Sequence, residues 1–498
     1  KKYPGDLDSL SNIMKIYYNL DKFEECISFS KDVLKIEESN INAMRFIARS
    51  YKNLLNLELS EKQYLEIIKI EPEDLDSLIM LTRIYFTREM YKECIKKANT
   101  ILSAHYESRI FDCAGYRTSI FENMNIRFAK REVLSASSAQ EMYWMLTSQF
   151  KNKLYNEAIK NLESFKFNKN NYLKESLRYS TLASSYDEIN KFDKAFEYFE
   201  LANSINFENN KKKLSKNRSI KLIDERIDFF NEINLKNWDN TDFESDLMSP
   251  IFIIGFPRSG TTLLNTILNS HPELGVIEEK PIVNKFIKLL DEEIYSNFSN
   301  LKNLDEKIIK KLRIAYFDIL KSYTTQDKEK VYIDKMPLNI IYVGEIVRIF
   351  PKAKFIFAMR HPCDCILSCF MQNFSLNDAM ANFTDLKSTS KFYNRVMTLW
   401  QQYLSVFKVN YHIIKYEDLV NNFEISVNNL LNFLNLEWSD NVKKFYETAK
   451  KQGKISTPSY NQVNKPIYSK SVGRWKNYEK HFQEIYPIIK PWIKNFGY

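Results

Sequence analysis

Residues 250–262 read Pro-Ile-Phe-Ile-Ile-Gly-Phe-Pro-Arg-Ser-Gly-Thr-Thr. The apolar run predicts a buried strand, and the two glycines that follow predict a tight turn that opens a helix. Successive backbone N–H groups in such a turn form an anion site together with the helix N-terminus. Gly255 and Gly260 have the spacing of a Walker A loop, but Thr261 stands where an ATPase or kinase places its lysine. The stretch therefore predicts a phosphate site in an α/β domain and argues against ATP hydrolysis.

The loop resembles the 5′-phosphosulfate loop of sulfotransferases, which use 3′-phosphoadenosine 5′-phosphosulfate (PAPS) and need no Mg²⁺. The resemblance implies a P-loop-like α/β sulfotransferase domain with a mainly parallel sheet. It also implies PAPS as the sulfuryl donor, 3′-phosphoadenosine 5′-phosphate as the product, and no metal. The residues expected to contact the donor here are Pro257, Arg258, Ser259, Gly260, Thr261 and Thr262. The alternative is a glycine-rich turn that binds no ligand.

A second apolar run, residues 355–359, ends at Arg360 and is followed by a predicted helix that carries Ser368. An arginine offers a fork of donors and a serine offers one hydroxyl, which together suit a phosphate group. The same spacing is used by sulfotransferases to hold the 3′-phosphate, so the resemblance implies this role for Arg360 and Ser368. Taken alone, an arginine at a strand end is more often a surface ion-pair partner.

A pair of carboxylates, Glu278 and Glu279, follows the loop and its helix. Within the family the chain most resembles tyrosylprotein sulfotransferase, whose general base is the second Glu of a Gly-Glu-Glu-Thr segment. In the family, this base follows the loop arginine at a fixed spacing. The residue at the same spacing after Arg258 is Glu279, so the resemblance implies Glu279 as the base. The alternatives are that the pair only begins a solvated helix, or that His271 serves as the base.

Lys335 lies in the segment Asp334-Lys335-Met336-Pro337, which resembles the Lys-Asp-Pro segment of the same family. It precedes Arg360 by the spacing that the family shows between its catalytic lysine and its 3′-phosphate arginine. The resemblance implies that Lys335 stabilises charge on the bridging oxygen of the leaving group. A strand-end lysine that faces water is the alternative.

Three further segments complete the resemblance, which spans roughly residues 250–478. Tyr416, at the end of a predicted strand, is expected to contact the nucleotide. Ser459 is expected to help stabilise the departing bridging oxygen, and Arg474 and Lys476 are expected to cover the bound nucleotide.

The chain also departs from the family pattern. Gln372 stands where another phosphate-binding arginine would be expected, and Val276 and Ile333 replace cysteines that pair in the secreted-pathway family. The missing cysteines suit a reducing compartment.

The N-terminal half contains a repeat with a period of 34 residues, which indicates tetratricopeptide repeats. The three clearest units are residues 7–40, 41–74 and 75–108, with Tyr17, Tyr51 and Tyr85 at equivalent positions. We expect five to six units that end near Asn206, stacked as an all-α solenoid whose groove binds a peptide or a partner protein. Packing on the catalytic domain or formation of a homodimer are the alternatives.

The expected domain organisation follows from these patterns. Residues 1–215 form the tetratricopeptide solenoid, residues 216–248 a connecting helix and linker, and residues 249–498 the sulfotransferase domain.

Composition limits the classes of function. The chain has 498 residues, 44% apolar content and a net charge of +9 without a dense basic patch, so nucleic-acid binding is not expected. No apolar run is long enough to span a membrane, and no signal peptide is visible, so we expect a cytoplasmic protein. The six cysteines show no disulfide framework, and Cys363, Cys365 and Cys369 lack partners that would complete a metal site.

We therefore expect a PAPS-dependent sulfotransferase that acts by in-line displacement with a glutamate base. The favoured acceptor is a tyrosine in a protein or peptide, and carbohydrate or small-molecule hydroxyls stay open. The alternatives from other classes are a P-loop kinase or nucleotidase and a catalytically silent tetratricopeptide scaffold.

Overall fold

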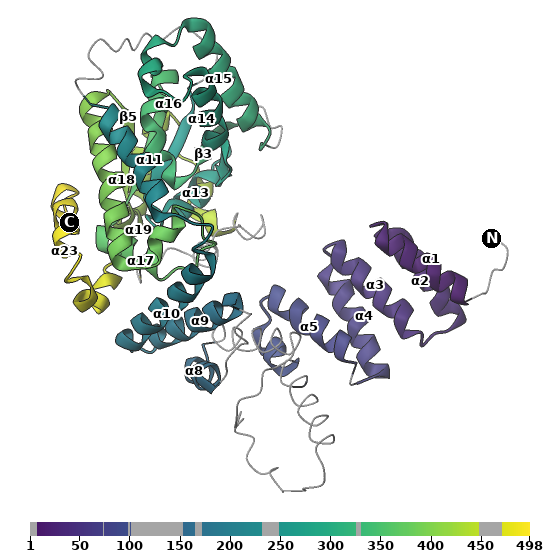
Figure 1. Ribbon diagram of the computed structural model, residues 1–498. Helices are drawn as coiled ribbons and strands as arrows, with labels where there is room; N and C mark the ends of the chain where they lie inside the picture. The colour runs from purple at the N-terminus through teal and green to yellow at the C-terminus, as the bar shows by residue number, and fades with distance from the viewer. Residues whose placement is uncertain are drawn as a thin grey trace. The chain divides into compact units, whose positions relative to one another are not determined.

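The computed structural model describes residues 7–72, 74–97, 100, 153–164, 172–231, 249–324, 330–447 and 471–498. The chain divides into two compact units, Lys1–Ile205 and Asn206–Tyr498. The described part of the first unit is helical, and the second builds a parallel sheet flanked by helices (Figure 1). The predicted fold class is therefore confirmed.

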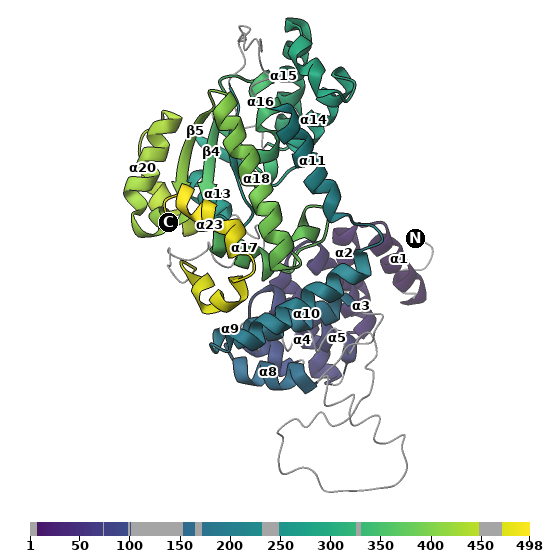
Figure 2. The same cartoon turned by 60° about the vertical axis from the view of Figure 1, so that its left-hand side comes forward.

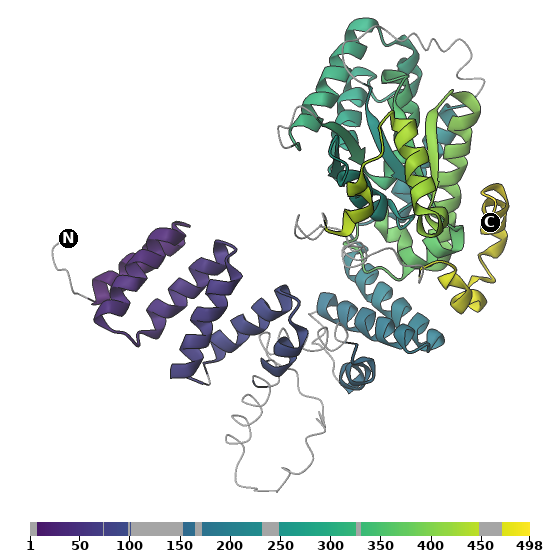
Figure 3. The ribbon, with the colours of Figure 1, turned by 180° about the vertical axis from the view of Figure 1, so that it is seen from behind.

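The helices of the first unit lie in antiparallel pairs, which Figures 1 and 3 show from opposite sides. They are α1 (Leu7–Asn19), α2 (Phe23–Ile36), α3 (Ile41–Asn53), α4 (Leu57–Ile70), α5 (Leu75–Thr87), α8 (Tyr155–Ser164) and α9 (Tyr172–Glu188). Residues 91–97, which follow α5, are also helical. The next helix, α10 (Phe192–Asn210), begins in this unit and ends in the second.

The turns inside the helix pairs repeat with the predicted period. A residue in the left-handed conformation follows the first helix of each pair, at Asp21, Leu55 and Glu89, which are equivalent positions of the three units. The next backbone N–H donates to a tyrosine carbonyl at 2.9 Å in every case, to Tyr17, Tyr51 and Tyr85. These are helix-ending bonds of the kind that stop a helix and redirect the chain.

A buried hydrogen bond between the two helices of each pair has the same period. Cys26 Sγ donates to the Met14 carbonyl at 3.5 Å, Ser60 Oγ to the Ala48 carbonyl at 2.8 Å, and Cys94 Sγ to the Thr82 carbonyl at 3.5 Å. Only a small side chain fits where the helices approach closely, and each of these also satisfies its polar atom. The predicted units from residue 101 to residue 152 lie outside the described residues.

The second unit is built on five parallel strands in the order β2-β3-β1-β4-β5. The strands are β1 (Ile251–Gly255), β2 (Leu274–Glu278), β3 (Val331–Lys335), β4 (Lys354–Met359) and β5 (Asn410–Lys415). All five residues of β1, the central strand, are buried, as expected for a strand covered on both faces. The carboxyl ends of all five strands meet at one edge of the sheet.

Helices cover both faces of this sheet. On one face, Ile253 of β1 packs with α13 (Thr261–Asn269) and α20 (Phe423–Leu434) in one apolar cluster. On the other face, Phe357 of β4 lies 5.0 Å from Trp400 of α18 (Leu386–Val406), ring centre to ring centre. Figure 2 shows strands β4 and β5 between α20 and α18.

The other helices of the unit lie around this core. They are α11 (Lys216–Phe229), α14 (Ile282–Glu293), α15 (Glu306–Lys321), α16 (Val343–Ile349), α17 (Pro362–Phe370), α19 (Tyr416–Asn421) and α23 (Tyr486–Asn495). The shorter 3-10 segments are Phe298–Asn303, Pro337–Tyr342, Met380–Phe383, Asp440–Lys444 and Arg474–Phe482. Across the described parts of the chain, no helix combines the length and the apolar character needed to cross a membrane.

Helix α11, predicted as a connecting helix, packs within the second unit through a buried ion pair. Arg226 Nη2 lies 2.6 Å from Glu345 Oε1 on α16, and the side chains are only 5% and 1% exposed. The guanidinium also lies 4.7 Å from the ring centre of Tyr342. The predicted linker residues 232–248 lie outside the described residues.

Glu345→Leu should destabilise the second unit, because it leaves the Arg226 guanidinium buried without a counter-charge, at a cost of about 3–5 kcal/mol. Urea unfolding of the full chain measures this loss. Adding Arg226→Met should recover most of it, since the double variant buries no lone charge. If both single and double variants unfold like the wild type, the ion pair does not hold α11 in place.

Candidate functional site

The site lies at the sheet edge formed by the carboxyl ends of the strands, where open α/β sheets bind their ligands. The register sets neighbours side by side: Glu278 pairs with Lys335, and Gly255 pairs with Ala358. Met359 pairs with Lys415, so the residues that follow β4 and β5 are neighbours as well. The predicted site residues on these strand ends are thereby brought to one edge.

The β1–α13 loop has the shape of an anion-binding turn. A Cβ at Gly255 would lie 2.5 Å from the Ala358 carbonyl oxygen, so only glycine fits beside β4. Gly260 has φ +93°, and a Cβ there would lie 2.7 Å from the Tyr416 ring. Arg258 also has a positive φ, of 69°. This conformation is uncommon outside glycine and is often found at ligand-binding loops. Pro257, Ser259, Thr261 and Thr262 are buried.

The two predicted phosphate-binding arginines meet at this loop. Arg258 Nε donates to Ser368 Oγ on α17 at 3.0 Å. Arg360 Nη1 donates to the Arg258 carbonyl at 3.1 Å, and its guanidinium lies 4.9 Å from the centre of the Tyr416 ring. The structure thus brings Arg258, Ser368, Arg360 and Tyr416 together, as the sequence predicts.

Two donors in this cluster are available to a ligand. Ser259 Oγ and Arg360 Nε are buried, and neither has a hydrogen-bond partner within the described residues. A buried unpaired donor is costly and is a common feature of sites that hold an anion. The close glycine backbone, the two arginines and these donors therefore fit an anionic group such as a phosphate or phosphosulfate.

Lys335 is fully buried and bridges both predicted carboxylates. Its Nζ lies 2.8 Å from Glu279 Oε1 and 3.1 Å from Glu278 Oε1. The Glu279 backbone has φ +49°, and its N–H donates to the Lys335 carbonyl at 2.8 Å, which fixes the turn after β2. The side chain of Glu279 is 39% exposed, against 16% for Glu278, so Glu279 is the carboxylate that a substrate reaches more readily.

These contacts argue against the two non-catalytic alternatives, a Lys335 that faces water and a glutamate pair that only begins a solvated helix. Lys335 does not face water, and Glu279 lies in a turn before α14 that is fixed by β3. A carboxylate and an ammonium in direct contact can serve as a proton acceptor and an electrostatic stabiliser.

Asp334 precedes Lys335 but points to the opposite face of β3, because side chains alternate along a strand. It is fully buried, and Tyr316 Oη lies 3.5 Å from its Oδ2. Burial raises the pKa of Asp334 to about 8, although the hydrogen bond from Tyr316 works to lower it. This carboxyl group therefore belongs to the sheet core, not to the Lys335 cluster.

The closing segment is attached to α17 by a carboxylate that sequence reasoning missed. Asp364, which is only 1% exposed, accepts from the Gly473 N–H at 2.7 Å and from the Trp475 N–H at 2.9 Å. His361 stacks on Trp475 with ring centres 5.3 Å apart. Asp364 thereby holds the backbone on both sides of Arg474.

The other predicted residues of the closing segment are placed only in part. Arg474 is half-buried, Lys476 is exposed, and the Ser471 carbonyl accepts from Arg360. Ser459 lies outside the described residues. Asp364 was missed because an acidic residue in a first helical turn is typical of simple helix-dipole stabilisation.

Comparison with known proteins agrees with this geometry. Residues 250–440 match the model of the sulfotransferase family. An uncharacterized protein of Aquifex aeolicus is 30% identical over 253 residues, which are 49% of this chain and 33% of that protein. The protein-tyrosine sulfotransferase of Drosophila melanogaster is 25% identical over 239 residues, which are 46% of this chain and 47% of that enzyme.

Among solved structures, the sulfotransferase domain of the Synechococcus PCC 7002 olefin synthase is similar to this chain. It has 23% sequence identity and a TM-score of 0.33, and the match covers 48% of this chain and 91% of that domain. The chain spans a third to about half of the length of the first curated relatives it matches.

His271, the alternative base, is engaged elsewhere in the second unit. Its Nε2 lies 3.0 Å from the Glu437 carbonyl oxygen, and its Nδ1 accepts from the Glu273 N–H at 3.3 Å. Both ring nitrogens are therefore occupied by backbone groups, which leaves Glu279 as the better candidate.

The three cysteines near Arg360 are buried thiols. Burial raises the pKa of Cys363 to about 12, with a further contribution from Asp364, and Cys369 Sγ donates to the Pro257 carbonyl at 3.3 Å. Within the described ranges, no cluster of three or more His, Cys, Asp or Glu side chains could hold a metal ion.

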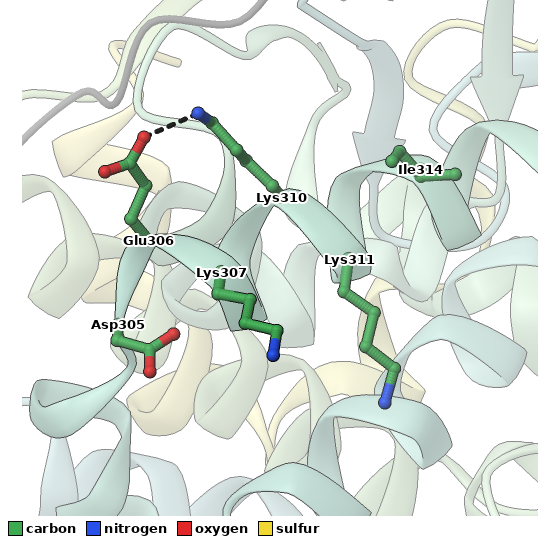
Figure 4. A pocket seen from close by; sticks show the side chains of 6 residues that line it. All are labelled: Asp305, Glu306, Lys307, Lys310, Lys311 and Ile314. Carbon is green, nitrogen blue, oxygen red and sulfur yellow. Dashed lines mark ion pairs between the residues drawn. The ribbon is translucent and has the colours of Figure 1, made fainter.

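A surface pocket of about 660 Å³ lies at the start of α15 and contains none of the predicted site residues (Figure 4). Its lining residues are Asp305, Glu306, Lys307, Lys310, Lys311 and Ile314. Lys310 pairs with Glu306, and Lys311 pairs with Glu293 outside the pocket, both at 2.5 Å. We assign this pocket no part in the chemistry of the sheet edge.

Asp364→Asn should loosen the closing segment, because an amide nitrogen cannot accept one of the two backbone hydrogen bonds. Trypsin should then cleave after Arg474 and Lys476 about tenfold faster, since a hydrogen bond to a charged group contributes roughly 1.5–3 kcal/mol. Mass spectrometry of timed digests gives the two rates.

The matched control is Asp305→Asn, the same change at the exposed N-cap of α15, which should leave both cleavage rates unchanged. Equal rates in wild type and Asp364→Asn would mean that Asp364 does not position this segment.

Proposed function

We propose that the second unit is a PAPS-dependent sulfotransferase that moves a sulfuryl group to an acceptor hydroxyl by in-line displacement. The observation that carries the proposal is the contact of Lys335 with Glu279 at 2.8 Å, at the same sheet edge as the β1–α13 loop. The family match of residues 250–440 supports the reaction class. A kinase or nucleotidase is disfavoured because Thr261 replaces the loop lysine.

The loop and the arginines would hold the donor. Backbone N–H groups of residues 258–262 and the Arg258 side chain would bind the 5′-phosphosulfate beside Pro257, and Arg360 with Ser368 would bind the 3′-phosphate. Arg360 now donates to the carbonyl groups of Arg258 and Ser471, so a bound phosphate would compete with these contacts. Tyr416, Arg474 and Lys476 would cover the nucleotide.

The Lys335 cluster would carry out the transfer. Glu279 accepts the proton of the acceptor hydroxyl, whose oxygen then forms the new bond to sulfur. Lys335 stabilises the negative charge on the bridging oxygen as its bond to sulfur breaks, and Ser459 would assist there. Because Lys335 binds Glu279 before the reaction, its turn toward the bridging oxygen also frees the Glu279 carboxylate to act as base.

A tyrosine in a protein or peptide is the acceptor that the relatives support best. The Drosophila relative is a protein-tyrosine sulfotransferase, and the repeats of the first unit are of a kind that binds proteins. Carbohydrate and small-molecule hydroxyls are the competing acceptors. A homodimer stays a prediction, and so does the scaffold alternative, in which neither unit catalyses a reaction.

Glu279→Gln should reduce transfer by about 10²–10⁴, because an amide cannot accept the proton, and Lys335→Ala should reduce it by a similar factor. Transfer of label from sulfur-labelled PAPS to a tyrosine peptide, a glycan and a simple phenol measures both the rate and the acceptor class.

Glu273→Gln is the matched control, since Glu273 is exposed and carries no role in the cluster. Full activity in either cluster variant would contradict the assignment. A wild-type chain that binds PAPS but transfers to none of the three acceptors would favour the scaffold.

A further inference from the structure

Arg360 and His361 follow β4 directly, and the backbone between them decides where the Arg360 guanidinium points. The His361 N–H donates to Glu417 Oε1, on α19, at 3.0 Å. A hydrogen bond to a carboxylate is shorter and stronger than one to a neutral acceptor. Glu417 therefore fixes the chain one residue after the arginine to which we assign the 3′-phosphate.

The Glu417 carboxylate is held in turn by Tyr498. Tyr498 Oη donates to Glu417 Oε2 at 2.7 Å, so each carboxylate oxygen has its own donor. Burial, and then the negative charge of Glu417, raise the pKa of Tyr498, so the phenol keeps its proton and remains a donor at neutral pH. With both oxygens engaged, the carboxylate cannot turn away from His361 without breaking a charge-assisted hydrogen bond.

The end of α23 directs Tyr498 to this place. Gly497 has φ +67°, the left-handed conformation that commonly ends a helix, and the Tyr498 N–H donates to the Ile493 carbonyl at 3.0 Å. These are features of the Schellman motif, which turns the chain at the end of a helix. Lys415, the last residue of β5, has its Nζ 4.7 Å from the centre of the Tyr498 ring. The position of Tyr498 is therefore set by the end of α23 and by β5.

The ring of Tyr498 also contacts His361. The two ring centres lie 5.1 Å apart at an interplanar angle of 62°, which is an edge-on arrangement. Tyr498 thus contacts the turn between β4 and α17 in two ways, through its ring and through its hydroxyl group. Replacement of Tyr498 by phenylalanine removes the hydroxyl and keeps the ring.

Helix α19 connects these contacts to the guanidinium of Arg360. Tyr416 and Glu417 are its first two residues, and the Tyr416 ring lies 4.9 Å from the Arg360 guanidinium while Glu417 holds His361. Two neighbouring residues of α19 thereby hold two neighbouring residues of the turn after β4. Hydrogen bonds weaken steeply as their angle departs from linear, so a shift of Glu417 would weaken any bond that Arg360 makes to a phosphate.

We propose that Tyr498 is a positioning residue for the donor site. Its hydroxyl orients Glu417, which fixes the backbone at His361 and so aims the Arg360 guanidinium at the 3′-phosphate. The inference rests on the proposed function, because it takes a 3′-phosphate as the ligand of Arg360. In this role Tyr498 acts through Glu417 and not by touching the nucleotide. The competing explanation is that Tyr498 only attaches the end of α23 to the second unit.

Isothermal titration of the full chain with 3′-phosphoadenosine 5′-phosphate and with 5′-AMP separates the two explanations. Tyr498→Phe should weaken binding of the bisphosphate about tenfold and change binding of 5′-AMP by less than about twofold, because only the bisphosphate uses Arg360.

Glu417→Gln should reduce the preference for the bisphosphate in the same way, because its side-chain nitrogen cannot accept a hydrogen bond. The double variant Tyr498→Phe with Glu417→Gln should lose no more of this preference than the more affected single variant, since both residues act through one series of contacts.

The matched control is Tyr323→Phe, which removes the hydroxyl of another partly buried tyrosine of the second unit. That hydroxyl accepts from Lys285 Nζ at 2.8 Å. The control should keep the wild-type preference for the bisphosphate, and circular dichroism should show all variants folded.

Three results would overturn the inference alone: an unchanged preference in Tyr498→Phe, equal weakening of both nucleotides, or additive losses in the double variant. A wild type that binds the bisphosphate no better than 5′-AMP would overturn the 3′-phosphate site of the proposed function, and this inference with it.

Discussion

The ammonium group of Lys335 is buried at the end of β3, and the structure around it follows from the need to neutralise that charge. Burying an isolated cation is costly, so Glu278 and Glu279 must both approach it. Parallel pairing of β2 with β3 sets Glu278 directly beside Lys335, and the left-handed turn at Glu279 brings in the second carboxylate. The same strand order puts β1 and its loop on the other side of β3. One electrostatic requirement thus joins the candidate base, the candidate leaving-group cation and the anion loop.

The sequence predicted the parts of this site that local pattern encodes. The strand, turn and helix around Gly255 and Gly260 follow from glycine spacing, and the repeats follow from the period of Tyr17, Tyr51 and Tyr85. The position of Arg360 at a strand end could also be predicted, because an apolar run followed by a cation is a local sequence pattern. At the loop, the structure brings Arg360 into contact with Arg258 and Tyr416.

The contacts that were not predicted join residues far apart in the chain. Asp364 accepts hydrogen bonds from the backbone at Gly473 and Trp475, and Arg226 pairs with Glu345. The sequence around Asp364 and around Arg226 gives no sign of these distant partners. An aspartate in a first helical turn has an adequate local explanation, and so its long-range role stays hidden. The sequence likewise does not predict the burial of Lys335, since a lysine at a strand end usually faces water.

The proposed chemistry requires that the sheet edge recognise a nucleotide with a 3′-phosphate. Isothermal titration of the full chain with 3′-phosphoadenosine 5′-phosphate, 5′-AMP and Mg-ATP measures this recognition, on wild type and on Arg360→Ala. We expect the bisphosphate to bind at least about tenfold more tightly than 5′-AMP, and Arg360→Ala to remove that preference, because a charge-assisted phosphate contact contributes roughly 1.5–3 kcal/mol. Equal binding of the bisphosphate and 5′-AMP, or tighter binding of Mg-ATP, would rule out a 3′-phosphate site at Arg360.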